Sequence, residues 1–179
     1  MKYGSLTQDE LTRLLTTAKA QSYRNWLMLL VGFSHGLRIS EILGLTATNV
    51  RDGFLVVKRL KGSETTTQPL LESGDPLFNE RAALEIWCKK NPSGPLFNLS
   101  RQRAWQIIQR LGKLTSVPSP LCHPHILKHT LAQLSIHTAG IENVRQMLGH
   151  KSMSSTGAYL KVDDVKATKA VYKALEGIV

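Results

Sequence analysis

Basic side chains gather after Pro124 at a spacing that places them on one side of a helix. At 100° per residue, a helix over residues 124–138 carries three leucines on one side: Leu127, Leu131 and Leu134. The opposite side carries His125, Lys128 and His129. We expect the leucines to face the core and the basic side to point away from it. Pro124 near the helix start and the positive end of the helix dipole favour an anion there. A solvated polar face without a ligand is the alternative.

The same segment also suggests a metal ion, because zinc ligands occur at the i, i+4 spacing of His125 and His129. Four candidate ligands cluster here: Cys122, His123, His125 and His129. No second pair of cysteines or histidines lies at the usual separation from them. We therefore expect no metal and no other cofactor.

The charge of the chain is strongly basic, above all in its second half. Lys and Arg total 23 against 13 Asp and Glu, a formal net charge of +10 over 179 residues. Between Ile86 and Val162 the only acidic residue is Glu142, and every histidine except His35 lies in that stretch. We expect a nucleic acid as the partner, since the positive charge favours a polyanion and no amphipathic basic helix indicates a membrane surface. A generally basic surface is the alternative. The candidate DNA-binding residues are Arg101, Arg103, Arg110 and Lys151.

Membrane and secretion signals are missing from the sequence. The longest apolar run, residues 26–33, is too short to span a bilayer and reads as a buried helix. The N-terminus lacks the layout of a secretory signal, and two cysteines make no disulfide framework. We expect a soluble protein in a reducing, cytoplasmic setting.

Periodicity and turn signals predict a mainly α protein with a small three-stranded antiparallel β-sheet. Thr7-Gln8-Asp9-Glu10 has capping-box form, and apolar residues follow at helical spacing. Asp52-Gly53 is a hairpin turn signal, and Lys61-Gly62 lies in the next turn. The expected strands after these turns cover residues 54–58 and 65–70. Beyond the first helix, we expect helices over residues 22–35, 40–43, 78–89, 101–114, 124–138, 142–148 and 163–175.

Five short segments, in this order, resemble the tyrosine recombinase (phage integrase) family. The segment from His35 to Ile42, HGLRISEI, is similar to the first arginine motif of the family, and Arg59-Leu60-Lys61-Gly62 to its lysine-bearing hairpin. The segment from His125 to Thr130, HILKHT, is similar to the His-x-x-Arg helix. The last two are Leu148-Gly149-His150 and Thr156-Gly157-Ala158-Tyr159. Each segment alone is weak, whereas their order and separation together are specific. The resemblance implies the catalytic-domain fold of that family.

Within the family, the chain looks most like the small bacterial recombinases that invert promoter switches for fimbriae. The likeness lies in residues 58–62, 65–71 and 123–125. Those recombinases lack the usual N-terminal core-binding domain, and this chain opens where the catalytic domain of the family opens. We expect residues 1–179 to be a single catalytic domain without a core-binding domain, as a complete short recombinase or as an excised domain.

The resemblance implies DNA cleavage by a side-chain nucleophile. Tyr159 would attack a phosphodiester and leave a 3′-phosphotyrosine and a free 5′-hydroxyl, so that the bond energy is kept for religation. Lys61 would protonate the leaving oxygen, and His125 would help to accept the tyrosine proton. A core tyrosine and a solvated turn lysine are the structural alternatives for Tyr159 and Lys61.

The resemblance also implies a set of clamps for the phosphate. Arg38 and Lys128 would hold its non-bridging oxygens, and His125 and His150 would donate hydrogen bonds to them. Glu41 would hold a neighbouring side chain in place. Lys128 departs from the family, which has arginine there, and lysine lacks the planar fork that grips two oxygens at once.

The expected function is that of a site-specific recombinase, an integrase or invertase. The resemblance implies double-stranded DNA as the partner and four protomers on two DNA sites, with accessory DNA-bending proteins as further partners. It also implies a bacterial or phage-infected host cell. Two alternatives stay open. A type IB topoisomerase would act on single sites, and a DNA-binding accessory protein weakened at Lys128 would never form a covalent adduct.

Overall fold

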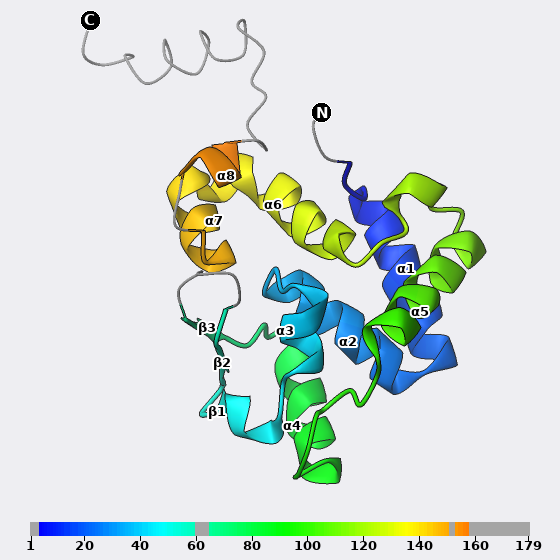
Figure 1. Ribbon diagram of the computed structural model, residues 1–179, viewed down its shortest axis with the longest axis vertical. Coiled ribbons are helices and arrows are strands. Elements are labelled where there is room, and N and C mark those ends of the chain that lie inside the picture. Colours follow the sequence, from blue (N-terminus) through cyan, green and yellow to red (C-terminus); the bar gives the residue numbers. More distant parts are fainter. Residues whose placement is uncertain (1–3, 60–64, 151–152, 158–179) are drawn as a thin grey trace, which may run out of the picture.

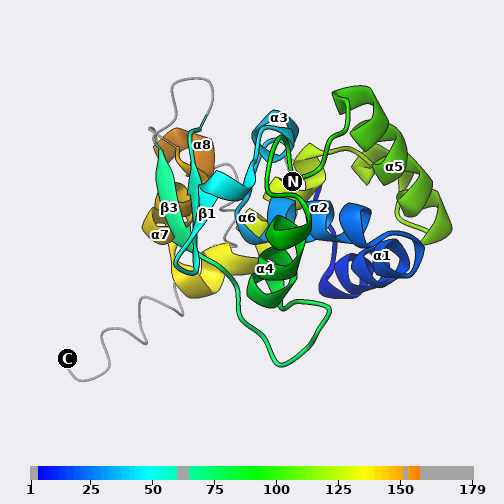
Figure 2. The same cartoon turned by 90° about the horizontal axis from the view of Figure 1, so that it is seen from below.

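The computed structural model describes residues 4–59, 65–150 and 153–157. Its helices surround one central helix, and a small sheet lies at one end (Figures 1 and 2). The sheet and α7 (Ile141–Leu148) lie at that end, whereas α1 (Gln8–Gln21) and α5 (Arg101–Leu114) lie at the other. Among the described helices, none has the length and apolar character needed to cross a membrane.

The first two helices begin at side-chain caps. The capping box predicted for α1 is present: the Thr7 hydroxyl accepts from the Glu10 amide at 3.2 Å, and the Glu10 carboxylate accepts from the Thr7 amide at 2.7 Å. Ser22 ends α1, and its hydroxyl accepts from the Asn25 amide to begin α2 (Tyr23–Ser34). One residue thus sets the turn between two packed helices.

The core is built around α2. Every side chain from Trp26 to Val31 is at most 1% exposed, so this helix is covered on all sides, as its apolar run predicts. It packs against α1, α4 (Glu80–Lys90) and α6 (His125–Ala139). The Trp26 indole donates to the Leu77 carbonyl at 3.1 Å, which fixes the loop before α4.

The predicted three-stranded antiparallel sheet is confirmed. It has the order β1 (Val50–Arg51), β2 (Phe54–Val57), β3 (Thr66–Pro69), and the first turn contains Asp52 and Gly53, both at positive φ. Leu55 and Val57 of β2 are buried, as are Thr66 and Gln68 of β3. One face of the sheet therefore packs on the helical body and carries polar as well as apolar side chains.

Shorter elements connect the body to the sheet and to α7. They are α3 (Ile39–Leu43), the 3₁₀ helices η1 (Ala47–Asn49) and η2 (Ser119–Leu121), and α8 (Met153–Gly157). The sequence patterns predicted α3 and α7 but not η1, η2 or α8. The helix predicted over residues 163–175 lies outside the described residues.

The prediction for the two sides of α6 was wrong in part. Lys128 does not point away from the core: it is only 5% exposed, whereas Leu134 is 44% exposed. The reason is that α7 packs against the second half of α6, where Ala132, Ile136, Val144 and Leu148 form a second small core. This second contact moves the buried side of α6 away from the leucine stripe, and Lys128 turns inward.

Gly36 joins α2 to α3 in a place that excludes a side chain. Its φ is +56°, in the left-handed region, and a Cβ there would lie 2.4 Å from a methyl carbon of Leu148. The turn that precedes Arg38 thus packs directly on the end of α7.

We predict that Gly36→Ala destabilises the protein by about 2–4 kcal/mol, from left-handed strain together with overpacking. Gly94→Ala is the matched control, because Gly94 has φ +74° but no atom lies within 4 Å of the position that a Cβ would take there. Urea unfolding measures both. Equal losses in the two variants would show that the contact with Leu148 does not matter.

Candidate active site

Arg38 is fixed at the start of α3 by Glu41. The Arg38 guanidinium donates to Glu41 Oε1 at 2.8 Å, and the Arg38 amide donates to Oε2 at 2.7 Å. The Glu41 side chain is fully buried, while that of Arg38 is 20% exposed. The backbone at the helix start and the carboxylate one turn later therefore hold the guanidinium at the surface of the site.

Arg59 is a buried residue of the site to which the sequence patterns assigned no role. Its guanidinium donates to Glu41 Oε2 at 3.3 Å and to the carbonyl oxygens of His35 at 2.9 Å and Met147 at 2.8 Å. Its Nε also donates to the Thr66 hydroxyl at 3.0 Å. Burial lowers the pKa of Arg59, and the charge of Glu41 opposes that shift. Arg59 thus joins the end of α2, α3, β3 and the end of α7.

A signal for Arg59 was present in the sequence. Strand residues alternate between two faces, and Leu55 and Val57 are the buried positions of β2. Arg59 continues that alternation two residues later and is only 4% exposed. The period of two therefore indicated an inward-facing arginine.

Lys128 lies among positive charges. Its ammonium donates to the Leu148 carbonyl at 3.2 Å, at the C-terminal end of α7. Burial lowers the pKa of Lys128 to about 7, with the charges of Arg38 and Arg59 acting in the same direction and Glu41 opposing them. This lysine is thus held close to both arginines.

His150 follows the left-handed Gly149, which ends α7. Its Nδ1 lies 2.9 Å from the Thr156 hydroxyl, and its carbonyl accepts from the Arg145 guanidinium at 2.7 Å. Burial lowers the pKa of His150 to about 4, and the charges of Lys128, Arg38, Arg59 and Arg145 act in the same direction. The structure therefore brings Arg38, Lys128 and His150 together, with His150 as a neutral imidazole at pH 7.

His125 stands at the exposed start of α6, beside two further histidines. The rings of His123, His125 and His129 lie 6.3–6.5 Å apart between centroids. Burial and the neighbouring basic groups lower the pKa of His129 to about 4. Within the described part of the chain, no group of three or more His, Cys, Asp or Glu side chains is arranged to hold a metal ion.

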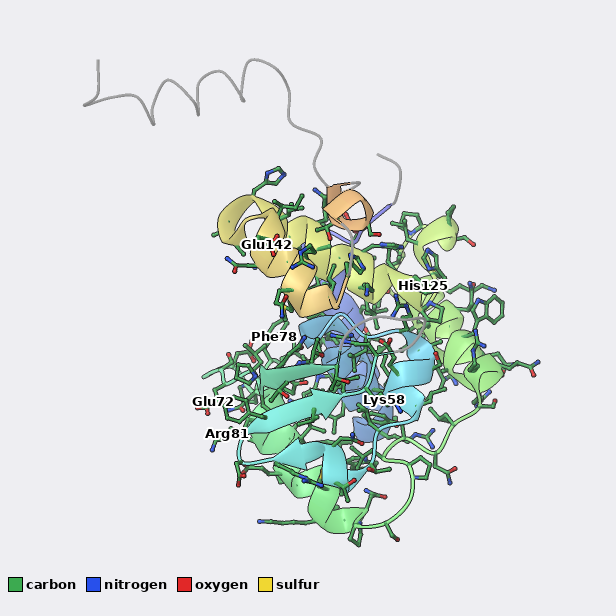
Figure 3. All side chains as sticks on the ribbon, turned by 60° about the vertical axis from the view of Figure 1, so that its left-hand side comes forward. Lys58, Glu72, Phe78, Arg81, His125 and Glu142 are labelled. Carbon is green, nitrogen blue, oxygen red and sulfur yellow. The ribbon has the colours of Figure 1, made fainter. Side chains whose placement is uncertain are left out.

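A surface pocket of about 380 Å³ connects His125 to α3 and α5. Its lining residues are Ile39, Arg101, Gln102, Trp105, Pro124 and His125. Ile39 directly follows Arg38, so the pocket lies beside the arginine motif. Figure 3 shows His125 and Lys58 on one side of the molecule, and Glu72, Arg81 and Glu142 on the other.

The remaining predicted site residues divide into two groups. Arg101, Arg103 and Arg110 lie exposed on α5. Lys61, Lys151 and Tyr159 lie outside the described residues.

Comparison with known proteins gives a consistent result. Residues 4–166 match the model of the phage integrase family. The chain is 29% identical to the tyrosine recombinase XerA of Pyrococcus horikoshii over 95% of its own length and 61% of that protein. It is 29% identical to the type 1 fimbriae regulatory protein FimE of Escherichia coli, over 78% of this chain and 75% of FimE.

The fold is also found in a solved structure. The catalytic domain of bacteriophage HP1 integrase superimposes with a TM-score of 0.67 at 23% identity, over 94% of each chain. The mostly helical architecture with a three-stranded antiparallel sheet is therefore a tyrosine recombinase catalytic-domain fold, as predicted.

We predict that Lys128 makes stability depend on pH in the alkaline range. Its pKa is lowered from 10.5 to about 7 on folding, so the unfolded chain binds more protons between these values. The wild type therefore gains stability as the pH rises from 7 to about 10, by up to about 4 kcal/mol at 1.36 kcal/mol per pKa unit.

Lys128→Met removes this gain. Urea unfolding of both proteins at pH 6, 8 and 10 measures their free energies of unfolding. The stability of the variant relative to the wild type should be highest at pH 6 and lowest at pH 10. A stability difference that is constant with pH would contradict the account.

Proposed function

The chain belongs to the phage integrase family, and on that premise we propose that it is a tyrosine-type site-specific DNA recombinase, an integrase or invertase. The observation that carries the proposal is the meeting of Arg38, Lys128 and His150 at one place beside the family's motifs. Such a cationic site would stabilise the negatively charged phosphorane that forms when DNA is cut.

In the proposed reaction, Tyr159 attacks the phosphorus of a DNA phosphodiester. A 3′-phosphotyrosyl bond forms, the bond to the 5′ oxygen breaks, and that oxygen takes a proton from Lys61 to become a hydroxyl. His125 helps to accept the phenolic proton. The roles of Tyr159 and Lys61 rest on their motifs, because both lie outside the described residues.

The described residues support the clamp in more detail. Arg38, oriented by Glu41, and Lys128 hold the non-bridging oxygens, and His150 donates a hydrogen bond to them. A neutral His150 has one ring N–H, and its Nδ1 faces the Thr156 hydroxyl. When Nδ1 accepts from that hydroxyl, Nε2 carries the proton and donates to the phosphate. Side-chain cations supply the charge, so the scheme requires no metal or other cofactor.

We further propose that double-stranded DNA lies across the basic face of the molecule. Arg101, Arg103, Arg110 and Lys151 would contact its phosphates. Residues 1–179 would serve as the catalytic domain, acting in the cytoplasm. Four protomers would assemble on two DNA sites, with accessory DNA-bending proteins where the sites require them.

A DNA-binding accessory protein is the second candidate function, and one observation favours it: the clamp residue Lys128 has a pKa near 7. A lysine with such a lowered pKa is partly uncharged at neutral pH, which weakens the clamp when no phosphate is bound. Formation of a covalent adduct separates the two candidates.

We predict that the wild type forms a covalent adduct with DNA and that Tyr159→Phe abolishes it, because phenylalanine has no oxygen nucleophile. The substrate is a library of nicked suicide duplexes with randomised arms, which also reveals the target sequence. Adducts are separated on a denaturing gel and the attached DNA is sequenced.

Tyr172→Phe is the matched control and should keep the adduct. A Tyr159→Phe adduct as abundant as that of the wild type would remove Tyr159 as the nucleophile. DNA binding by the wild type with no adduct on any substrate would favour the accessory protein.

We predict that Lys128→Arg keeps or raises cleavage, and that the gain grows with pH. Arginine stays charged, whereas Lys128 loses its proton as the pH rises above about 7 unless bound phosphate retains it. Cleavage rates at pH 7 and pH 9 measure this, and the ratio of variant to wild type should rise severalfold. A large loss in the variant at both pH values would assign Lys128 a role that arginine cannot perform.

A further inference from the structure

A chain of buried polar side chains lies beneath the site and has no part in the proposed reaction. His35 Nδ1 lies 2.6 Å from Gln68 Oε1, and His35 Nε2 lies 3.0 Å from each oxygen of Glu80. The Gln68 amide nitrogen donates to the Met147 carbonyl at 2.6 Å. These side chains come from α2, β3 and α4 and lead to the last turn of α7.

The direction of these hydrogen bonds is fixed by chemistry. The Met147 carbonyl can only accept, so the NH₂ of Gln68 must face it and the amide oxygen must face His35. His35 Nδ1 therefore carries a proton. On the other side of the ring, Nε2 lies 3.0 Å from Glu80 Oε2, which also accepts from the Leu71 amide at 3.1 Å. His35 is thus held between Gln68 and Glu80, with its Nδ1–H directed at the Gln68 oxygen.

The pair of His35 and Glu80 is held rigidly, because their side chains are 2% and 0% exposed. Arg59 also contacts His35, since its guanidinium donates to the His35 carbonyl. The hydrogen bond from His35 Nδ1 to the Gln68 oxygen is short, at 2.6 Å, so it leaves the amide little freedom.

Gln68 acts on α7 at the point where that helix ends. The Met147 carbonyl accepts from both Gln68 and Arg59, and the next carbonyl, that of Leu148, accepts from Lys128. The last carbonyl groups of a helix have no hydrogen-bond partner within the helix. The side chains that donate to the Met147 and Leu148 carbonyls therefore decide where α7 ends. Two residues after Leu148, the chain reaches His150.

We propose that Gln68, oriented by the buried His35–Glu80 pair, is a positioning residue that fixes the end of α7 and thereby places His150 beside Arg38 and Lys128. The relevance to DNA cleavage rests on the proposed function, while the positioning itself does not.

The first test uses the wild-type protein and nuclear magnetic resonance of the histidine ring nitrogens. At pH 7.5 we expect a proton on Nδ1 of His35 and a single protonated nitrogen for His150. A His35 ring without a proton on Nδ1 would overturn the proposal, because the Gln68 oxygen would then lack its donor.

The second test replaces Gln68 by methionine, which has similar volume but no amide. Thr67→Met is the matched control, because Thr67 lies on the exposed face of the same strand. In Gln68→Met the His150 ring should leave its cationic, buried surroundings, and its titration midpoint should move from about 4 toward 6.5 by at least one pH unit. Thr67→Met should leave the midpoint unchanged.

A Gln68→Met protein that unfolds at lower temperature but keeps the His150 midpoint would overturn the proposal, since Gln68 would then be a structural residue only. If that variant does not fold, the His35 measurement on the wild type still decides. A shifted His150 midpoint together with no DNA adduct in the wild type would refute the proposed function and leave the positioning role intact.

Discussion

The site depends on one buried carboxylate, Glu41, that two guanidinium groups share. Arg38 and Arg59 both donate to it, and its side chain is fully buried. A carboxylate in such surroundings stays charged only with close cationic partners, and removing Glu41 would leave the buried Arg59 guanidinium without its carboxylate partner. The arrangement orients Arg38 toward the surface while it ties Arg59 to the ends of α2 and α7.

The positive charges around Glu41 exceed the negative charge that it supplies. Burial lowers the pKa values of Lys128 and His150, the neighbouring cations act in the same direction, and Glu41 opposes the effect on Lys128. A site of this kind gains from an oxyanion, which replaces water and offsets the mutual repulsion of the cations.

Local signals in the sequence predicted most of the fold. The capping box at Thr7 and the turn at Asp52-Gly53 act within a few residues, so they could be read directly. The inward turn of Lys128 could not, because it depends on α7 packing across α6, a contact between separate elements. The alternation of β2 indicated that Arg59 faces inward. Its carbonyl partners at His35 and Met147 could not be predicted, because they come from distant parts of the chain. The motifs around Arg38 and His150 predicted that these residues share one site, and the two lie close together in the structure. Their catalytic roles and that of Tyr159 stay predictions.

The central claim is that Arg38, Lys128 and His150 form a single phosphate-binding site. The most direct measurement is a titration of the ¹⁵N-labelled chain with inorganic phosphate, followed by nuclear magnetic resonance. The account predicts saturable shifts of the Arg38 side-chain N–H and of the Lys128 and His150 amides, all with one dissociation constant, and no shift at Arg13. Saturation centred on α5 instead, or weak shifts spread over all basic residues, would contradict it.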